Sequence, residues 1–214
     1  MESMDTTKVL LAIETCHKYH PHRTLAQRQS WLPHSPFPHK FFYGVTQPLR
    51  SRIDDDEIFL AVPDDYPSLP LKTRAIVRYA IARDYQFMVK MDDDTWINPP
   101  LLEGSGYDQY DYVGMRCDPH DGWPAPYAAG GFYWLSRKAM EIVSEMDIHD
   151  SVEDRGVGNV LLANDIRLVD TGLHSAQVFI DPLSSRYRGD SEQGKISIHE
   201  CTPEYMDHLT RVYL

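Results

Sequence analysis

The sequence alternates short apolar runs with segments of helical period, and this alternation limits the available folds more than any other feature. Strands are expected at Lys8–Ile13, Lys40–Val45, Ile58–Val62, Phe87–Met91, Gly131–Leu135 and Arg167–Val169. Helices are expected at Arg23–Trp31, Leu71–Arg83, Lys138–Met146 and Gly156–Ala163. Strands that alternate with helices favour a layered α/β fold, in which helices flank a central and mostly parallel sheet.

Composition and charge narrow the class of protein. The 214 residues carry a formal net charge of -11, so the chain lacks the basic surface that binding to nucleic-acid phosphates requires. No apolar run approaches the ~20 residues that span a bilayer, and the N-terminus does not resemble a secretory signal. Three widely spaced cysteines show no metal-type pairing. We therefore expect free thiols and a cytoplasmic, reducing environment.

The chain shows no linker or repeat, so we expect one domain over residues 1–214. Its last segment, EYMDHLTRVYL, has the pattern of an amphipathic helix that ends without a cap. The same pattern is expected if this is the N-terminal part of a longer chain.

An acidic triplet, Asp92 to Asp94, directly follows the apolar run at 87–91. Ligands of such sheets bind at the carboxyl ends of strands, and adjacent carboxylates suit a hard cation such as Mn²⁺ or Mg²⁺. Such an ion can bridge the phosphates of a nucleoside diphosphate. A second triplet at 54–56 follows charged residues instead, and we interpret it as a solvated loop. The context of the first triplet therefore favours a metal site.

A second acidic pair, Glu153 and Asp154, lies near the start of an expected helix. Carboxylates there are favoured by the helix dipole, so simple capping is one interpretation. The other is a general base that takes a proton from an acceptor hydroxyl. A metal site and a separate base are together what glycosyl transfer from a nucleotide sugar requires.

Three residues are candidates for binding the nucleotide and its phosphates. Thr15 follows the first expected strand, where it would contact the base or ribose. Arg28 and Lys72 are expected to pair with phosphates, the alternative being ordinary exposed helix charges.

Other residues are expected around an acceptor. Gly130 and Gly131 permit a close approach of the backbone to a ligand, or else simply begin a strand. Trp123 and Tyr127 offer aromatic surface to a sugar ring. His199 stands at a strand end, where a structural hydrogen bond is the commoner role for a lone histidine. The residues alone do not decide whether His199 also binds a metal.

The order of these motifs resembles the fringe and β-1,3-galactosyltransferase group of GT-A glycosyltransferases. The similar blocks are RTLAQRQSW (23–31), DEIFLAVPDDYPSLPLKT (56–73), FMVKMDDDTWINP (87–99), PYAAGGFYWLSRKA (126–139), VEDRGVG (152–158) and the histidine at 199. The chain departs from the pattern at 132–134 and 155–156, and these departures leave the donor sugar and the acceptor open.

The resemblance implies a Rossmann-like GT-A fold and transfer of a sugar from a nucleotide donor, UDP-linked by the family's habit, to a hydroxyl of a glycan or glycoprotein. It also implies Mn²⁺ or Mg²⁺ as the cofactor. Asp94, His199 and Asp92 would be metal ligands, Asp92 and Asp93 would face the nucleotide, and Asp154 would be the base. Glu153 would lie on the acceptor side. The family inverts the configuration at the anomeric carbon, but retention of configuration in a distant member stays an open alternative.

Two other functions remain open from the sequence. A metal-dependent nucleotide phosphohydrolase would use several converging carboxylates and often two metals. A carbohydrate-binding protein with the same fold would not turn over substrate and would not need Asp154.

Overall fold

The computed structural model describes residues 4–45, 55–118, 125–147, 152–176 and 192–214. The strands are β1 (Val9–Glu14), β2 (His39–Gly44), β3 (Glu57–Leu60), β4 (Phe87–Asp92), β5 (Trp96–Ile97), β6 (Tyr112–Cys117), β7 (Tyr127–Ser136), β8 (His174–Ala176) and β9 (Ser197–His199). The helices are α1 (His22–Gln29), α2 (Leu69–Ala82), α3 (Pro99–Glu103), α4 (Arg137–Ser144), α5 (Glu153–Ala163) and α6 (Pro203–Tyr213). Short 3₁₀ turns are at Thr6–Lys8, Leu32–His34, Tyr66–Ser68 and Tyr107–Gln109.

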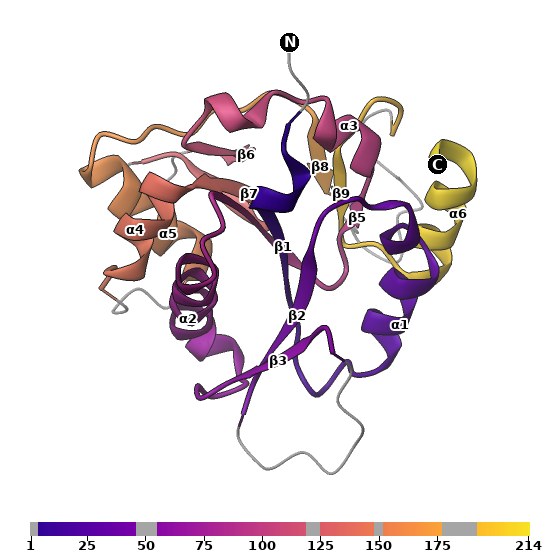
Figure 1. Cartoon of the computed structure of the whole chain (residues 1–214), viewed down its shortest axis with the longest axis horizontal. Helices are drawn as coiled ribbons and strands as arrows, with labels where there is room; N and C mark the ends of the chain where they lie inside the picture. Colours follow the sequence, from indigo (N-terminus) through magenta and orange to yellow (C-terminus); the bar gives the residue numbers. More distant parts are fainter. Residues whose placement is uncertain (1–3, 46–54, 119–124, 148–151, 177–191) are drawn as a thin grey trace.

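The main sheet has six strands in the order β3-β2-β1-β4-β7-β6. The first four in this order are parallel, whereas β7 is antiparallel to both β4 and β6. Figure 1 shows α2, α4 and α5 on one face of this sheet and α1 and α6 on the other. The predicted α/β fold with a mostly parallel sheet is therefore confirmed. Within the described ranges, no helix is both long and apolar enough to cross a membrane.

Two apolar layers hold the helices onto the sheet. Alternate residues of β1 divide between them, because successive strand residues point to opposite faces. Leu11 and Ile13 pack on the α1 and α6 side, whereas Leu10 and Ala12 pack on the α2, α4 and α5 side. The last residue of β1, Glu14, follows the second set. A carboxylate therefore lies where this apolar layer meets the carboxyl end of β1.

Polar side chains set where several helices begin. The Ser136 hydroxyl accepts a hydrogen bond from the Ala139 amide at the start of α4, and the Thr202 hydroxyl accepts from the Tyr205 amide at the start of α6. Asn98 does the same for α3. Such caps satisfy amides that have no partner within the helix. At α5 the first turn instead carries Glu153, which is buried.

A second sheet of three short strands, β5-β9-β8, joins the C-terminal segment to the middle of the chain. β5 begins two residues after Asp94 and pairs with β9 in antiparallel fashion, with Trp96 opposite Ile198. The pairing carries the end of β9 to the carboxyl end of β4. Parts of the chain far apart in sequence therefore meet there.

The structure differs from the sequence prediction at the second half of the sheet. β7 runs from Tyr127 and is longer than the predicted 131–135, and β6 and β8 were not predicted. The predicted strand at Arg167–Val169 is wrong, because only Val169 forms a single bridge, to Val113. The three cysteines are free thiols, as expected.

Candidate active site

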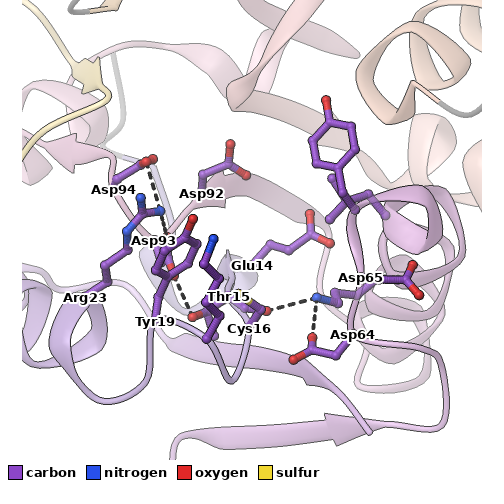
Figure 2. Close-up of a pocket in the computed structure, with 14 residues that line it drawn as sticks. Glu14, Thr15, Cys16, Tyr19, Arg23, Asp64, Asp65, Asp92, Asp93 and Asp94 are labelled. Carbon is purple, nitrogen blue, oxygen red and sulfur yellow. Dashed lines mark hydrogen bonds and ion pairs between the residues drawn. The ribbon is translucent and has the colours of Figure 1, made fainter. Parts of the chain in front are cut away.

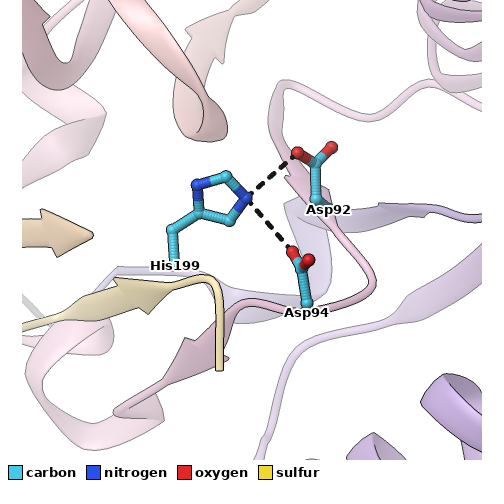
Figure 3. A group of neighbouring side chains, drawn as sticks. All are labelled: Asp92, Asp94 and His199. Carbon is cyan, nitrogen blue, oxygen red and sulfur yellow. Dashed lines mark ion pairs between the residues drawn. The ribbon is translucent and has the colours of Figure 1, made fainter. Parts of the chain in front are cut away.

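Three potential metal ligands meet at the end of β4. His199 Nε2 lies 3.1 Å from Asp94 Oδ1 and 3.3 Å from Asp92 Oδ2, as Figure 3 shows. One ligand atom from each residue lies within 4.8 Å of the others. The Asp94 Oδ1 atom is buried and makes no well-aligned hydrogen bond within the described part of the chain. Two carboxylates and an imidazole form a donor set that suits Mn²⁺.

Local backbone features bring His199 to this point. Glu200 has a left-handed φ of 62°, and this turn lets the Cys201 amide donate a 2.8 Å hydrogen bond to the Asp94 carbonyl. Gly131 faces the histidine ring, and a Cβ at this glycine would lie 2.2 Å from His199 Cγ. The ring fits only because residue 131 has no side chain. We call Asp92, Asp94 and His199 the metal group. Gly131 contributes to it by leaving space for the His199 ring, and not by contacting a bound molecule.

The charges of the cluster are strongly coupled. Burial opposes ionisation of Asp92, but Lys90 and His199 hold the pKa of that carboxyl well below its usual range. Burial would lower the pKa of His199, yet the two facing carboxylates raise it to about 10. Metal ligation requires the neutral imidazole, so binding an ion would release this proton.

A cavity of about 460 Å³ opens beside the acidic triplet. Figure 2 shows its lining residues. They come from the carboxyl ends of β1 and β4, the start of α1, and the segment that leads into α2: Glu14, Thr15, Cys16, Lys18, Tyr19, Arg23, Asp64, Asp65, Tyr66, Leu69, Lys72, Asp92, Asp93 and Asp94. The strand ends thus form a site at the edge of the sheet where α/β proteins bind ligands.

Arg23 is the cation nearest to the triplet on this side. Its Nη1 lies 2.7 Å from Asp93 Oδ1 and 3.0 Å from Asp94 Oδ2, and its guanidinium stacks 3.8 Å above the Tyr19 ring. The Thr15 hydroxyl donates a 2.7 Å hydrogen bond to Asp93 Oδ2. Burial raises the pKa of Asp93 to about 6, although Thr15 and Arg23 oppose the shift. Both oxygens of Asp93 are thus bound by side chains of the protein, whereas Asp92 and Asp94 each direct an oxygen toward His199.

The two predicted phosphate-binding cations have different positions. Lys72 is buried, lines the cavity, and pairs with Asp64 at 2.8 Å. Arg28 does not line the cavity but pairs with Asp56 at 2.6 Å and with Glu57 at 3.2 Å. Asp56 belongs to the triplet that was interpreted as a solvated loop, so that interpretation misses its ion pair. Arg23 occupies the position that was expected for Arg28.

A buried lysine links the metal group to the start of α5. Lys90 Nζ lies 2.7 Å from Asp92 Oδ1, 3.1 Å from Glu14 Oε2 and 3.5 Å from Glu153 Oε2. It also donates a 2.9 Å hydrogen bond to the Gly130 carbonyl. Burial would lower the pKa of Lys90, but the three carboxylates outweigh burial and raise it. Lys90 is therefore a charged group that pairs both with the metal group, through Asp92, and with the start of α5, through Glu153.

Asp154 and Glu153 differ in their surroundings. Asp154 Oδ2 accepts a 2.9 Å hydrogen bond from the Gly130 amide, and its Oδ1 accepts from the Arg155 amide. Burial raises the pKa of Asp154, with Lys90 opposing. Glu153 is more deeply buried, accepts a hydrogen bond from the Tyr133 hydroxyl, and has a pKa raised to about 7 by burial. Asp154 is the more accessible of the two carboxylates.

The remaining acceptor-side predictions are placed in part. Tyr127 lies against α5, because a Cβ at Gly158 would come within 2.4 Å of Tyr127 Cβ. Gly130 is beside both acidic residues of α5, and Gly131 is beside His199. Trp123 lies outside the described residues. Trp96 and Trp134 are fully buried in the core.

Three residues of the site were not predicted to belong to it. Arg23 was visible as a motif match, but its role was given to Arg28. Lys90 stands inside the FMVKMDDD block, two residues before Asp92, and Glu14 ends the first strand. A charged residue inside or at the end of an otherwise apolar strand was the signal that could have identified both, since buried charges need partners.

Comparisons with known proteins concern the fold and part of the sequence. No protein-family profile matches the sequence. The probable β-1,3-galactosyltransferase 13 of Arabidopsis thaliana is 33% identical over 100 residues, and the match spans 37% of this chain and only 29% of the plant protein.

Solved structures match more of the chain. The galactosyltransferase LgtC, in complex with donor and acceptor sugar analogues, is 12% identical with a TM-score of 0.54, covering 95% of this chain and 96% of LgtC. A glycosyltransferase involved in glycosylation of the major capsid of PBCV-1 is 12% identical with a TM-score of 0.52, covering 94% and 98%. The mannosyltransferase PcManGT of Pyrobaculum calidifontis, in complex with GDP-Man and Mn²⁺, is 11% identical with a TM-score of 0.50, covering 76% and 54%. The chain thus has the GT-A glycosyltransferase fold and, over part of its length, resembles a β-1,3-galactosyltransferase.

Proposed function

We propose that this protein is a metal-dependent glycosyltransferase that moves a sugar from a nucleotide donor to a hydroxyl of a glycan or glycoconjugate. The observation that carries the proposal is the Asp92, Asp94 and His199 group at the rim of a 460 Å³ cavity. Asp154 is connected to this group through Gly130, whose amide donates to Asp154 and whose carbonyl accepts from Lys90, the partner of Asp92. Donor and acceptor chemistry therefore have separate places in one site.

The metal group fits Mn²⁺ or Mg²⁺ on chemical grounds. Asp92 and Asp94 supply hard oxygen ligands, and His199 adds a nitrogen that favours Mn²⁺. The buried Asp94 Oδ1 lacks a well-aligned hydrogen bond among the described residues, and coordination to an ion would satisfy this oxygen. When bound, a divalent ion would stabilise the charge of the leaving diphosphate.

The donor cavity offers further contacts for the nucleotide. Arg23 is partly exposed beside Asp94 and can pair with a phosphate oxygen, and Lys72 adds a second positive charge in the buried part of the lining. Positive groups fixed near a leaving diphosphate lower the barrier to its departure. We assign the donor as UDP-linked from the resemblance to β-1,3-galactosyltransferases, and PcManGT with its GDP-Man makes guanosine donors the comparison to test.

Asp154 is the proposed general base. Two backbone amides hold its carboxylate in place, and its raised pKa makes it a stronger proton acceptor than an ordinary aspartate. It would take the proton of the acceptor hydroxyl as the sugar is transferred. Activation of the acceptor hydroxyl by an accessible carboxylate such as Asp154 favours an inverting transfer.

The other two functions have less support. The described residues contain a single group of three or more metal-ligating side chains, whereas a phosphohydrolase often uses two metals. A sugar-binding protein without turnover would not need a carboxylate held as Asp154 is held.

The test is calorimetric titration of UDP and GDP, then of their sugar conjugates, with Mn²⁺ and with a chelator. We expect UDP to bind with Mn²⁺ and not with the chelator, and binding to be lost in Asp94→Ala. Asp55→Ala is the matched control, because Asp55 is an exposed aspartate in the other acidic triplet. Nucleotide binding that is equal with and without metal would contradict the proposal.

A further inference from the structure

Glu14 is a buried carboxylate inside the donor cavity that the proposed reaction leaves unused. Its side chain is only 3% exposed, yet it lines the cavity. Its Oε1 atom has no hydrogen-bond partner within the described part of the chain, whereas Oε2 forms an ion pair with Lys90 Nζ at 3.1 Å. A buried acceptor without a partner is costly, so such a group indicates a missing hydrogen-bond donor.

The position of Glu14 fits contact with the transferred sugar rather than with the nucleotide. It stands opposite Asp92 in the β1–β4 pairing, and Lys90 joins its carboxylate to those of Asp92 and Glu153. Figure 2 shows its carboxylate in the middle of the lining residues, between Asp92 and Asp65. The sugar of a nucleotide donor must lie between the metal-bound diphosphate and the acceptor base. Glu14 lies near that interval, because Lys90 pairs with Glu14, with Asp92 on the metal side and with Glu153 at the start of α5.

We propose that Glu14 accepts hydrogen bonds from hydroxyls of the donor sugar and thereby selects a neutral sugar over one that carries a carboxylate. This inference rests on the proposed function of the site. The Oε1 atom can accept a sugar O–H, and a bond to a charged or partly charged acceptor is stronger than a neutral one. Selection of the donor sugar then comes both from attraction of its hydroxyls and from repulsion of a sugar carboxylate.

The repulsive part follows from the other acidic groups. Glu14 and Glu153 both pair with Lys90, and the charges of Glu14 and Asp154 both act on Glu153. Burial raises the pKa of Glu14, with Lys90 and Lys72 opposing. An oxygen of the carboxyl group can accept a hydrogen bond from a sugar hydroxyl whether or not the group is ionised. A uronate placed there would bring a further negative charge into a buried acidic group, which is unfavourable.

The test uses matched pairs of donors that differ at one carbon: UDP-glucose with UDP-glucuronate, and UDP-galactose with UDP-galacturonate. Calorimetry with Mn²⁺ gives a dissociation constant for each and for UDP. We expect wild type to bind at least one neutral donor roughly tenfold or more tighter than its uronate. In Glu14→Gln that ratio should narrow by about tenfold, while the affinity for UDP stays within about twofold.

Two further variants make the result specific. Glu57→Gln is the control, because Glu57 is also a buried strand carboxylate with a cationic partner but does not line the cavity. It should leave every ratio unchanged. Glu14→Asp keeps the charge but withdraws it by one methylene, so it should weaken neutral donors and still reject uronates, which is measurable even if the glutamine variant folds poorly.

The outcomes separate this inference from the proposed function. If UDP binds wild type with Mn²⁺ but neither Glu14 variant changes sugar discrimination, Glu14 does not contact the sugar and the inference is wrong. A wild-type protein that binds no uridine or guanosine nucleotide would instead overturn the proposed function itself. A wild type that prefers uronates would also refute the inference.

Discussion

The close packing of Gly131 against His199 gives a sharp test of how the metal group is built. In Gly131→Ala the new Cβ would lie 2.2 Å from His199 Cγ and 2.4 Å from Nδ1. Ordinary carbon contacts begin near 3.5 Å, so the ring must retreat by roughly 1.3 Å. Metal–ligand distances tolerate only about 0.2 Å. The substitution should therefore remove His199 from the ligand set while every ligand residue is still present.

The expected result is a loss of about tenfold to hundredfold in Mn²⁺ affinity, the range found when groups that orient ligands are changed. Electron paramagnetic resonance titration of free Mn²⁺ measures it without any nucleotide. Gly104→Ala is the matched control, because a Cβ there meets only the Pro100 carbonyl at an ordinary 3.6 Å. His199→Ala should match Gly131→Ala. A folded Gly131→Ala protein, as judged by circular dichroism, with wild-type Mn²⁺ affinity would refute the assignment of His199.

Three other results follow from the described contacts. Arg23→Ala should weaken UDP binding about tenfold or more, whereas Arg28→Ala should change it less than about twofold in the same titration. Asp154→Asn should lower the transfer or donor-hydrolysis rate by ~10²–10⁴-fold with UDP affinity unchanged, and a smaller effect in initial-rate assays would exclude it as the base. Burial lowers the pKa of His174 to about 3. Below pH 6.5 only the unfolded chain is protonated there, so wild type should lose up to about 1.4 kcal/mol of unfolding free energy per pH unit more than His174→Asn, as urea melts would show.

The sequence predicts the structure best at β4, where an apolar run leads directly into the acidic triplet. The apolar run at 87–91 was predicted as a strand, the acidic triplet as its ending, and the structure has β4 at Phe87–Asp92. Strand β6 was missed because YVGMRC contains a glycine and a register shift near Gly114 that break the alternating pattern. Tertiary pairing with β7 holds this strand in place, and local sequence does not record such pairing.

The choice between Arg23 and Arg28 shows a second limit. Both lie in or beside one predicted helix, and residues five apart in a helix point about 140° away from each other. Only one of them can face the triplet, and the sequence does not say how the helix is turned. Lys90, Glu14 and Glu153 likewise meet across three elements of the fold. Their contacts depend on strand order, which residue spacing alone does not give.

If the proposed ion binds, the pairing of β5 with β9 would couple its binding to the docking of the C-terminal segment. β5 has only two residues, so its pairing with β9 contributes few hydrogen bonds. This pairing nevertheless holds β9, which ends at His199, beside the middle of the chain. An ion held by both Asp94 and His199 would act as a cross-link between the middle and the end of the chain. By linkage, an ion at a hundred times its dissociation constant adds about 2.7 kcal/mol to the docked state. The amides of β9 should then exchange with solvent more slowly as Mn²⁺ is added, which makes the C-terminal strand a reporter of occupancy.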